Sequence, residues 1–152
     1  MPPGTSSGSS SRLFTEVRER RGLCYTVYAS LHTQRDRASV LCYAGTTAQR
    51  AQETLDVTVR ELLRLGEGIQ QSELDRLKAR IKSSLIMQQE SSSARSGSIA
   101  RDWAHLRFVR TMDEIAALID GLTCQSIGKF LAEHPPQDFT IVTLGPQALV
   151  MP

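Results

Sequence analysis

The chain has 152 residues, of which 40% are hydrophobic and 22% charged, as expected for a globular protein with one modest core. Its net charge of +2 argues against a dedicated nucleic-acid-binding protein, because such proteins usually carry a large basic excess. No apolar run approaches the roughly 18 residues that a membrane-spanning helix needs. The N-terminus also lacks the charged start and apolar stretch of a signal peptide. We therefore expect a soluble protein with no membrane span and no targeting segment in this chain, whose location stays unknown.

The N-terminal region combines a tail with a short helix. Residues 1–10 are rich in Pro, Gly and Ser, which predicts a flexible tail, and we expect residues 11–152 to form a single domain. Residues 11–20 predict a helix that Gly22 ends. Its apolar side is formed by Leu13, Phe14 and Val17.

A β-hairpin is predicted next. Residues 24–31 alternate in a way that is typical of a strand, residues 32–38 are polar and predict a turn, and residues 39–45 predict the second strand. Strict alternation would place four side chains on one face of the first strand: Tyr25, Val27, Ala29 and Leu31.

Helices follow the hairpin. Residues 45–68 predict an amphipathic helix, whose apolar stripe would be Ala51, Leu55, Val59, Leu62 and Leu63. A capping box from Ser72 to Asp75 predicts the start of a second long helix. The weak helix formers around Gly97 predict a break there, with helix resuming as far as Leu106.

The C-terminal third predicts two short helices and a strand. A capping box from Thr111 to Glu114 and a cap at Thr123 predict the two helix starts. Residues 138–145 predict a final strand. Taken together, the elements indicate an α+β fold in which helices cover one face of an antiparallel sheet.

No catalytic centre can be built from spacing. The three histidines, His32, His105 and His134, have no metal-ligand partner at a helical interval, and HExxH and its inversion HxxEH are both absent. We therefore predict no metal site and no cofactor in this chain. The cysteines Cys24, Cys42 and Cys124 form no CxxC pair, and we interpret them as buried free thiols.

A resemblance adds what spacing does not provide. The segment SSRLFTEVRERRGLCYTVYAS resembles the start of the C-terminal half-domain signature of the pitrilysin/insulinase-type zinc peptidases, in their processing-peptidase-like branch. Further similar segments follow in the same order: YAGTTAQRAQETLDVTVREL, the long helix with Glu73, Leu74 and Lys78 and then Glu90 and Ser91, and the closing FTIVTLGP. The resemblance runs from about residue 9 to residue 146.

The resemblance implies a substrate-binding pair. In this family the zinc-free half contributes an arginine and a tyrosine seven residues apart, which correspond to Arg18 and Tyr25. A tyrosine hydroxyl can donate to an oxygen that gains negative charge, and a guanidinium can hold peptide carbonyls. Spacing alone leaves the alternative that Arg18 is a surface residue and Tyr25 a core aromatic. By the same resemblance, the arginines of residues 11–25 would line a peptide chamber rather than contact DNA.

The expected function is therefore that of a non-catalytic, substrate-contacting half of a zinc metalloendopeptidase. The zinc would lie in a zinc-bearing homologous half, either in the same parent chain or in a separate subunit, and the substrate would be a peptide. The alternative is a scaffold or assembly module of the same fold without a peptidase role. The family's half-domain begins with a strand and a helix that this sequence lacks, so we expect a domain incomplete at its N-terminus. It would expose a sheet edge through which copies could associate.

Overall fold

A computed structural model describes residues 11–152, so the predicted tail of residues 1–10 lies outside the described residues. The chain divides into two compact units. Unit 1 contains the chain up to Gly66 together with Pro135–Pro152, and unit 2 contains Glu67–His134. Each unit is described by itself.

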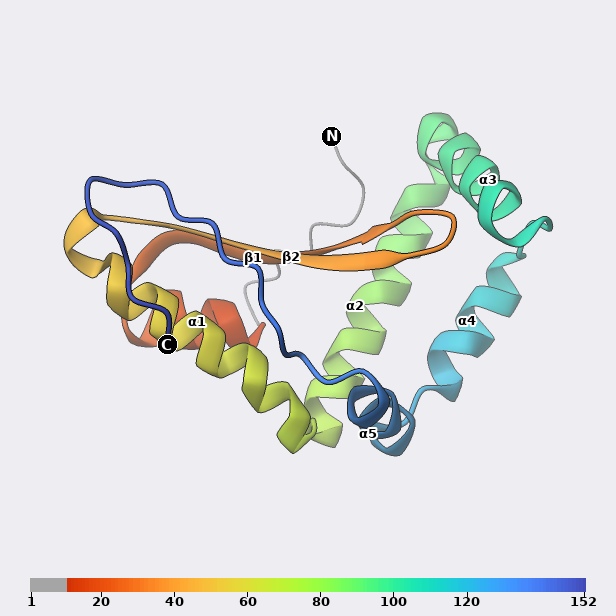
Figure 1. The fold of residues 1–152 in the computed structure, drawn as a ribbon. Coiled ribbons are helices and arrows are strands. Elements are labelled where there is room, and N and C mark those ends of the chain that lie inside the picture. The colour runs from red at the N-terminus through yellow and green to blue at the C-terminus, as the bar shows by residue number, and fades with distance from the viewer. Residues whose placement is uncertain (1–10) are drawn as a thin grey trace. The chain divides into compact units, whose positions relative to one another are not determined.

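Unit 1 is built on the predicted hairpin (Figure 1). The π-helical segment η1 (Phe14–Arg20) is followed by β1 (Cys24–Thr33) and β2 (Ala38–Thr46), which pair as an antiparallel two-stranded sheet. A short 3-10 turn η2 (Ala48–Arg50) leads into α1 (Ala51–Leu63), and η3 (Arg64–Glu67) follows. Gly22 has φ of 60°, a left-handed conformation that favours glycine, and its N–H donates to the Arg18 carbonyl, so η1 ends where predicted.

The core of unit 1 lies between one face of the sheet and two helices. Val17 of η1 and Val57 of α1 are fully buried there, beside Leu23 and Val27. The predicted apolar stripe of α1 is partly wrong, because Val59 is buried but Leu63 is exposed. The buried residues of α1 are Thr54, Val57, Thr58, Val59 and Glu61, of which three are polar. The α+β class with helices over one sheet face is confirmed.

A β-bulge changes the predicted face of β1. The register shifts between Cys24 and Thr26, which pair with Thr46 and Gly45, so Tyr25 is the extra residue. Cys24 and Val27 are therefore both buried, whereas Tyr25 is 64% exposed. The prediction that Tyr25 and Val27 share a face is wrong, because strict alternation holds only where the ladder is regular. β1 also continues through His32, which the sequence placed in the turn.

The predicted strand over residues 138–145 does not form. The segment belongs to unit 1, yet Val142 is 89% exposed and Leu144 is fully exposed. Strand propensity reflects pairing and packing on a sheet, so β-forming side chains do not make a strand where no neighbouring strand pairs with the backbone.

Unit 2 consists of helices. They are α2 (Gln71–Gln89), α3 (Ser92–Leu106), α4 (Met112–Gly121) and α5 (Cys124–Glu133). The predicted caps at Thr111 and Thr123 are confirmed, because their hydroxyls accept from the N–H groups of Glu114 and Ser126. Lys78 and Lys82 of α2 both bind Asp120, at the end of α4.

Two predicted helix boundaries in unit 2 are wrong. The cap of α2 lies two residues earlier than Ser72, because the Glu73 carboxylate accepts from the Gln70 N–H at 2.9 Å. The helix break falls at residues 90–91 rather than near Gly97. The Ser91 hydroxyl accepts from the Ala94 N–H and starts α3, and a capped helix tolerates an interior glycine at a cost of only ~1 kcal/mol.

No single helix among residues 11–152 is long and apolar enough to cross a membrane. Taken together, α4 and α5 reach the length and composition of a span, but they are bent by 82° at the break between them.

An ion pair between a buried carboxylate and a half-buried guanidinium joins α3 to the loop that leads into α4. Asp102 is nearly buried, and Arg110 donates to its carboxylate from the backbone N–H at 3.1 Å, from Nε at 3.2 Å and from Nη2 at 2.6 Å. The hydrogen bonds from Arg110 stabilise the ionised carboxylate, and this effect exceeds the opposing effect of burial. The pKa of Asp102 therefore lies below its usual 3.8.

We predict that Asp102→Asn destabilises unit 2 at pH 7 by about 1–3 kcal/mol, because it removes the negative charge of a buried carboxylate that accepts three hydrogen bonds from Arg110. A lowered folded-state pKa stabilises the fold above the unfolded pKa, and this contribution disappears as the pH falls below about 3.8. The difference between wild type and variant should therefore shrink between pH 5 and pH 3, as measured by urea unfolding followed by circular dichroism. Asp113→Asn, an exposed control, should change stability by less than about 1 kcal/mol. An Asp102→Asn effect that is the same at both pH values would contradict this assignment.

Candidate functional site

Tyr25 is presented at the start of β1 by the bulge. Its ring is exposed, and its hydroxyl makes no hydrogen bond within residues 11–152. The backbone just before it is held, because the Thr46 hydroxyl donates to the Leu23 carbonyl at 2.5 Å and Arg50 donates to the Gly22 carbonyl. A free phenol on a fixed strand end can donate to a ligand with little conformational rearrangement.

Arg18 lies on η1 and is exposed. Its guanidinium carbon is 5.0 Å from the centre of the Phe14 ring, within the range of a cation–π contact. No hydrogen bond joins these two predicted site residues, Arg18 and Tyr25, in the described part of the chain. Both present a polar group that is available to a ligand.

The three cysteines are free thiols, as predicted, but only Cys24 is buried. Burial raises the pKa of Cys24, and the positive charge of Arg18 partly opposes this effect. Burial, with a smaller contribution from Cys24, raises the pKa of Cys42 to about 11. Both remain protonated at neutral pH, and a protonated thiol is a poor nucleophile.

The histidines do not fit a zinc site. His32 is in β1, with its Nε2 2.9 Å from the Ser30 hydroxyl. His105 lies on α3, and His134 ends α5, where it stacks on Phe130. Residues 11–152 contain no group of three or more His, Cys, Asp or Glu side chains that could hold a metal ion. The described residues therefore offer no ligand set to the zinc that the resemblance implies.

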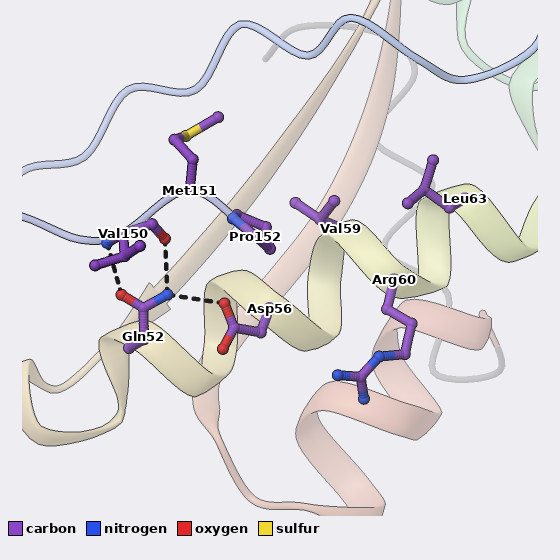
Figure 2. Close-up of a pocket in the computed structure, with 8 residues that line it drawn as sticks. All are labelled: Gln52, Asp56, Val59, Arg60, Leu63, Val150, Met151 and Pro152. Carbon is purple, nitrogen blue, oxygen red and sulfur yellow. Dashed lines mark hydrogen bonds between the residues drawn. The ribbon is translucent and has the colours of Figure 1, made fainter.

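A groove of about 610 Å³ lies between α1 and residues 150–152 (Figure 2). The Gln52 carboxamide bonds the backbone of Val150 in both directions, donating to its carbonyl and accepting from its N–H at 2.8 Å each. Asp56 accepts from the same Gln52 nitrogen at 2.8 Å and so fixes the orientation of the amide. The groove is lined on one side by residues 150–152. Sequence reasoning missed this role of Gln52, because nothing in the pattern around it indicates a partner 98 residues away.

The comparison with protein families identifies the amino-terminal half of the chain. Residues 5–81 match the family described as the peptidase M16 inactive domain. Among curated proteins, the chain is 29% identical over 140 residues to the uncharacterized zinc protease YmxG of Bacillus subtilis, covering 90% of this chain and 34% of the relative. It is equally identical to the uncharacterized zinc protease Rv2782c of Mycobacterium tuberculosis, covering 91% of this chain and 32% of the relative.

Solved structures show the same fold. A peptidase M16 inactive domain from Pseudomonas fluorescens superposes with a TM-score of 0.73 at 23% identity, covering 86% of this chain and 31% of that chain. The periplasmic protease PqqL from Escherichia coli superposes with a TM-score of 0.61 at 21% identity, covering 77% of this chain and 13% of that one. The chain spans about a third of the length of the curated relatives it matches, YmxG and Rv2782c.

We predict that Gln52→Ala releases the C-terminal residues from α1. Two hydrogen bonds of about 1 kcal/mol each hold the Val150 backbone, so exchange of the Val150 amide hydrogen should accelerate roughly five- to thirtyfold, as measured by NMR. Gln49→Ala, at an exposed position of η2, is the matched control and should leave this rate unchanged. Equal exchange rates in wild type and Gln52→Ala would show that the carboxamide does not hold the segment.

Proposed function

Since the chain belongs to the family of the peptidase M16 inactive domain, we propose that it is the non-catalytic, substrate-contacting half of a zinc metalloendopeptidase. The observation that carries this proposal is the exposed Tyr25 phenol on a held strand end, in a set of described residues without a metal-ligand cluster. The curated relatives are named zinc proteases, and this chain covers about a third of each. The zinc would therefore be supplied by a zinc-bearing homologous half, in the same parent chain or in a separate subunit.

In such an assembly, Tyr25 acts on the reacting carbonyl of a peptide. Its hydroxyl donates a hydrogen bond to the carbonyl oxygen as this oxygen gains negative charge during attack by water. Because the hydroxyl has no internal partner in residues 11–152, it need not break a hydrogen bond within the chain to do so. Hydrogen bonds to the Leu23 and Gly22 carbonyls fix the backbone that precedes Tyr25 before the substrate arrives, which lowers the cost of ordering the residue.

Arg18 contributes to binding rather than to the reacting bond. Its guanidinium carries several N–H donors in one plane and can hold carbonyl oxygens of an extended peptide. The contact with Phe14 orients the side chain without using its N–H donors.

Exposed apolar side chains on the hairpin support a protein partner. Leu31 is 58% exposed, Val40 is 66% exposed and Leu41 is 54% exposed. Leu31 and Val40 are cross-strand partners on one face of the hairpin, and Leu41 lies on the other face. Large exposed apolar side chains side by side on a surface mark protein contacts. We assign them to contact with other protein within the assembly, and to association between copies when the chain is alone.

We predict that Tyr25→Phe lowers kcat for peptide cleavage by about 10²-fold in an assembly with the cognate zinc-bearing half, because removal of one donor to the reacting oxygen typically costs this much. The measurement is steady-state hydrolysis of a fluorogenic peptide. Tyr43→Phe is the matched control, since Tyr43 is also an exposed phenol on the same sheet, and it should keep wild-type kcat. Unchanged cleavage by Tyr25→Phe would remove the mechanism and favour the scaffold alternative.

We also predict that Arg18→Ala raises KM about tenfold and changes kcat little, because a group that binds the substrate and the transition state equally affects only binding. The same peptide assay separates the two constants. Arg21→Ala, which removes an exposed arginine at the end of η1, should leave KM unchanged. A lowered kcat with normal KM would assign Arg18 to the chemical step instead.

A further inference from the structure

The bulge leaves Tyr25 without a partner residue on β2. Cys24 pairs with Thr46 and Thr26 pairs with Gly45, so Tyr25 is the unmatched residue between two ladder pairs. A bulged residue lies outside the regular pairing, and its side chain is not held by a cross-strand neighbour in the usual way. The backbone that lies next to the Tyr25 ring on β2 is that of Gly45.

Gly45 provides a bare stretch of backbone against which the ring lies. A Cβ added to Gly45 would lie 2.7 Å from Cε2 and 2.9 Å from Cζ of Tyr25. It would also lie 2.9 Å from Cγ2 of Thr26. Unlike Gly22 and Gly68, Gly45 does not have a positive φ, so its backbone does not itself require glycine. The absence of a side chain at this position therefore matters for the ring, and Cζ is the ring atom that carries the hydroxyl.

The same junction between β2 and α1 fixes the backbone before Tyr25. Thr46 follows Gly45, and its hydroxyl donates to the Leu23 carbonyl. The Thr54 hydroxyl lies 3.1 Å from the Thr46 hydroxyl and donates to the Arg50 carbonyl at 2.7 Å. Arg50 in turn donates to the Gly22 carbonyl. Residues 45–54 thus lie against the ring of Tyr25 and also bind the carbonyls of Gly22 and Leu23.

From this geometry we propose that Gly45 is the positioning residue for Tyr25, because its missing side chain lets the phenol ring lie against β2 and sets where the hydroxyl points. The claim about position depends only on the structure. Its consequence for catalysis rests on the proposed function, in which Tyr25 contacts the reacting oxygen.

The test is Gly45→Ala in the full chain, read in two ways. NMR of tyrosine labelled with ¹³C in the ring, assigned with Tyr25→Phe, should show a shifted Tyr25 resonance, because the ring cannot keep its place beside a Cβ. In the assembly with the zinc-bearing half, kcat should fall about as far as in Tyr25→Phe, with KM little changed. In a Tyr25→Phe background, Gly45→Ala should lower kcat no further, because both changes act through the same hydroxyl.

Gly66→Ala is the matched control, since a Cβ there meets no atom within 4 Å, and it should change neither readout. An unshifted Tyr25 resonance in Gly45→Ala would overturn the positional claim whatever the activity. A shifted resonance with normal kcat would support the positional claim and overturn the catalytic role of Tyr25, which separates the two failures.

If Gly45→Ala does not fold, adding Tyr25→Ala and Thr26→Ser removes the atoms that the Cβ would meet and should restore folding. Failure of this triple variant to fold would overturn the proposal.

Discussion

Burial of Val17 against Val57 is the contact on which the rest of unit 1 depends. These are the two side chains that are fully buried among the described residues, and they join η1 to α1 around the start of β1. Burying a valine contributes about 1.5–3 kcal/mol, which is a large share of the stability of a core this small. Leu23, Cys24 and Val27 are all buried in this core, and Tyr25, the extra residue of the bulge, points outward. The exposure of Tyr25 is thus a consequence of the bulge, which turns this residue away from the buried face of the strand.

Much of the fold could be predicted because local signals determine it. Gly22 ends η1, the polar turn joins the two strands, and the hydroxyls of Thr111 and Thr123 begin their helices. Two errors are local, because the caps at Gln70 and Ser91 set helix boundaries that the sequence placed elsewhere. Two other errors fall where a longer-range contact decides the outcome. Alternation could not reveal the bulge, which is set by the pairing of Cys24 and Thr26 with β2, and propensity could not reveal that residues 138–145 lack a strand to pair with.

The candidate site was less accessible to sequence reasoning than the fold. Arg18 and Tyr25 came from resemblance alone, because neither residue belongs to a spacing pattern that carries chemistry. Gly45 did leave a signal, since a glycine inside a strand often marks a close approach of another group. Glu73 and Lys78, conspicuous in the segment that resembles the family's long helix, have structural contacts here: Glu73 caps α2, and Lys78 donates to the Asp120 carbonyl at 2.9 Å.

The central claim is that this polypeptide supplies Arg18 to bind a peptide substrate and Tyr25 to polarise its carbonyl, while the zinc is bound by the homologous half. The most direct measurement is metal content together with peptide hydrolysis for the purified chain, for the cognate zinc-bearing half and for their mixture. The account predicts stoichiometric zinc only with the zinc-bearing half, and cleavage in the mixture far above that of either component. Stoichiometric zinc bound to this chain, or peptide cleavage by this chain without a partner, would contradict it.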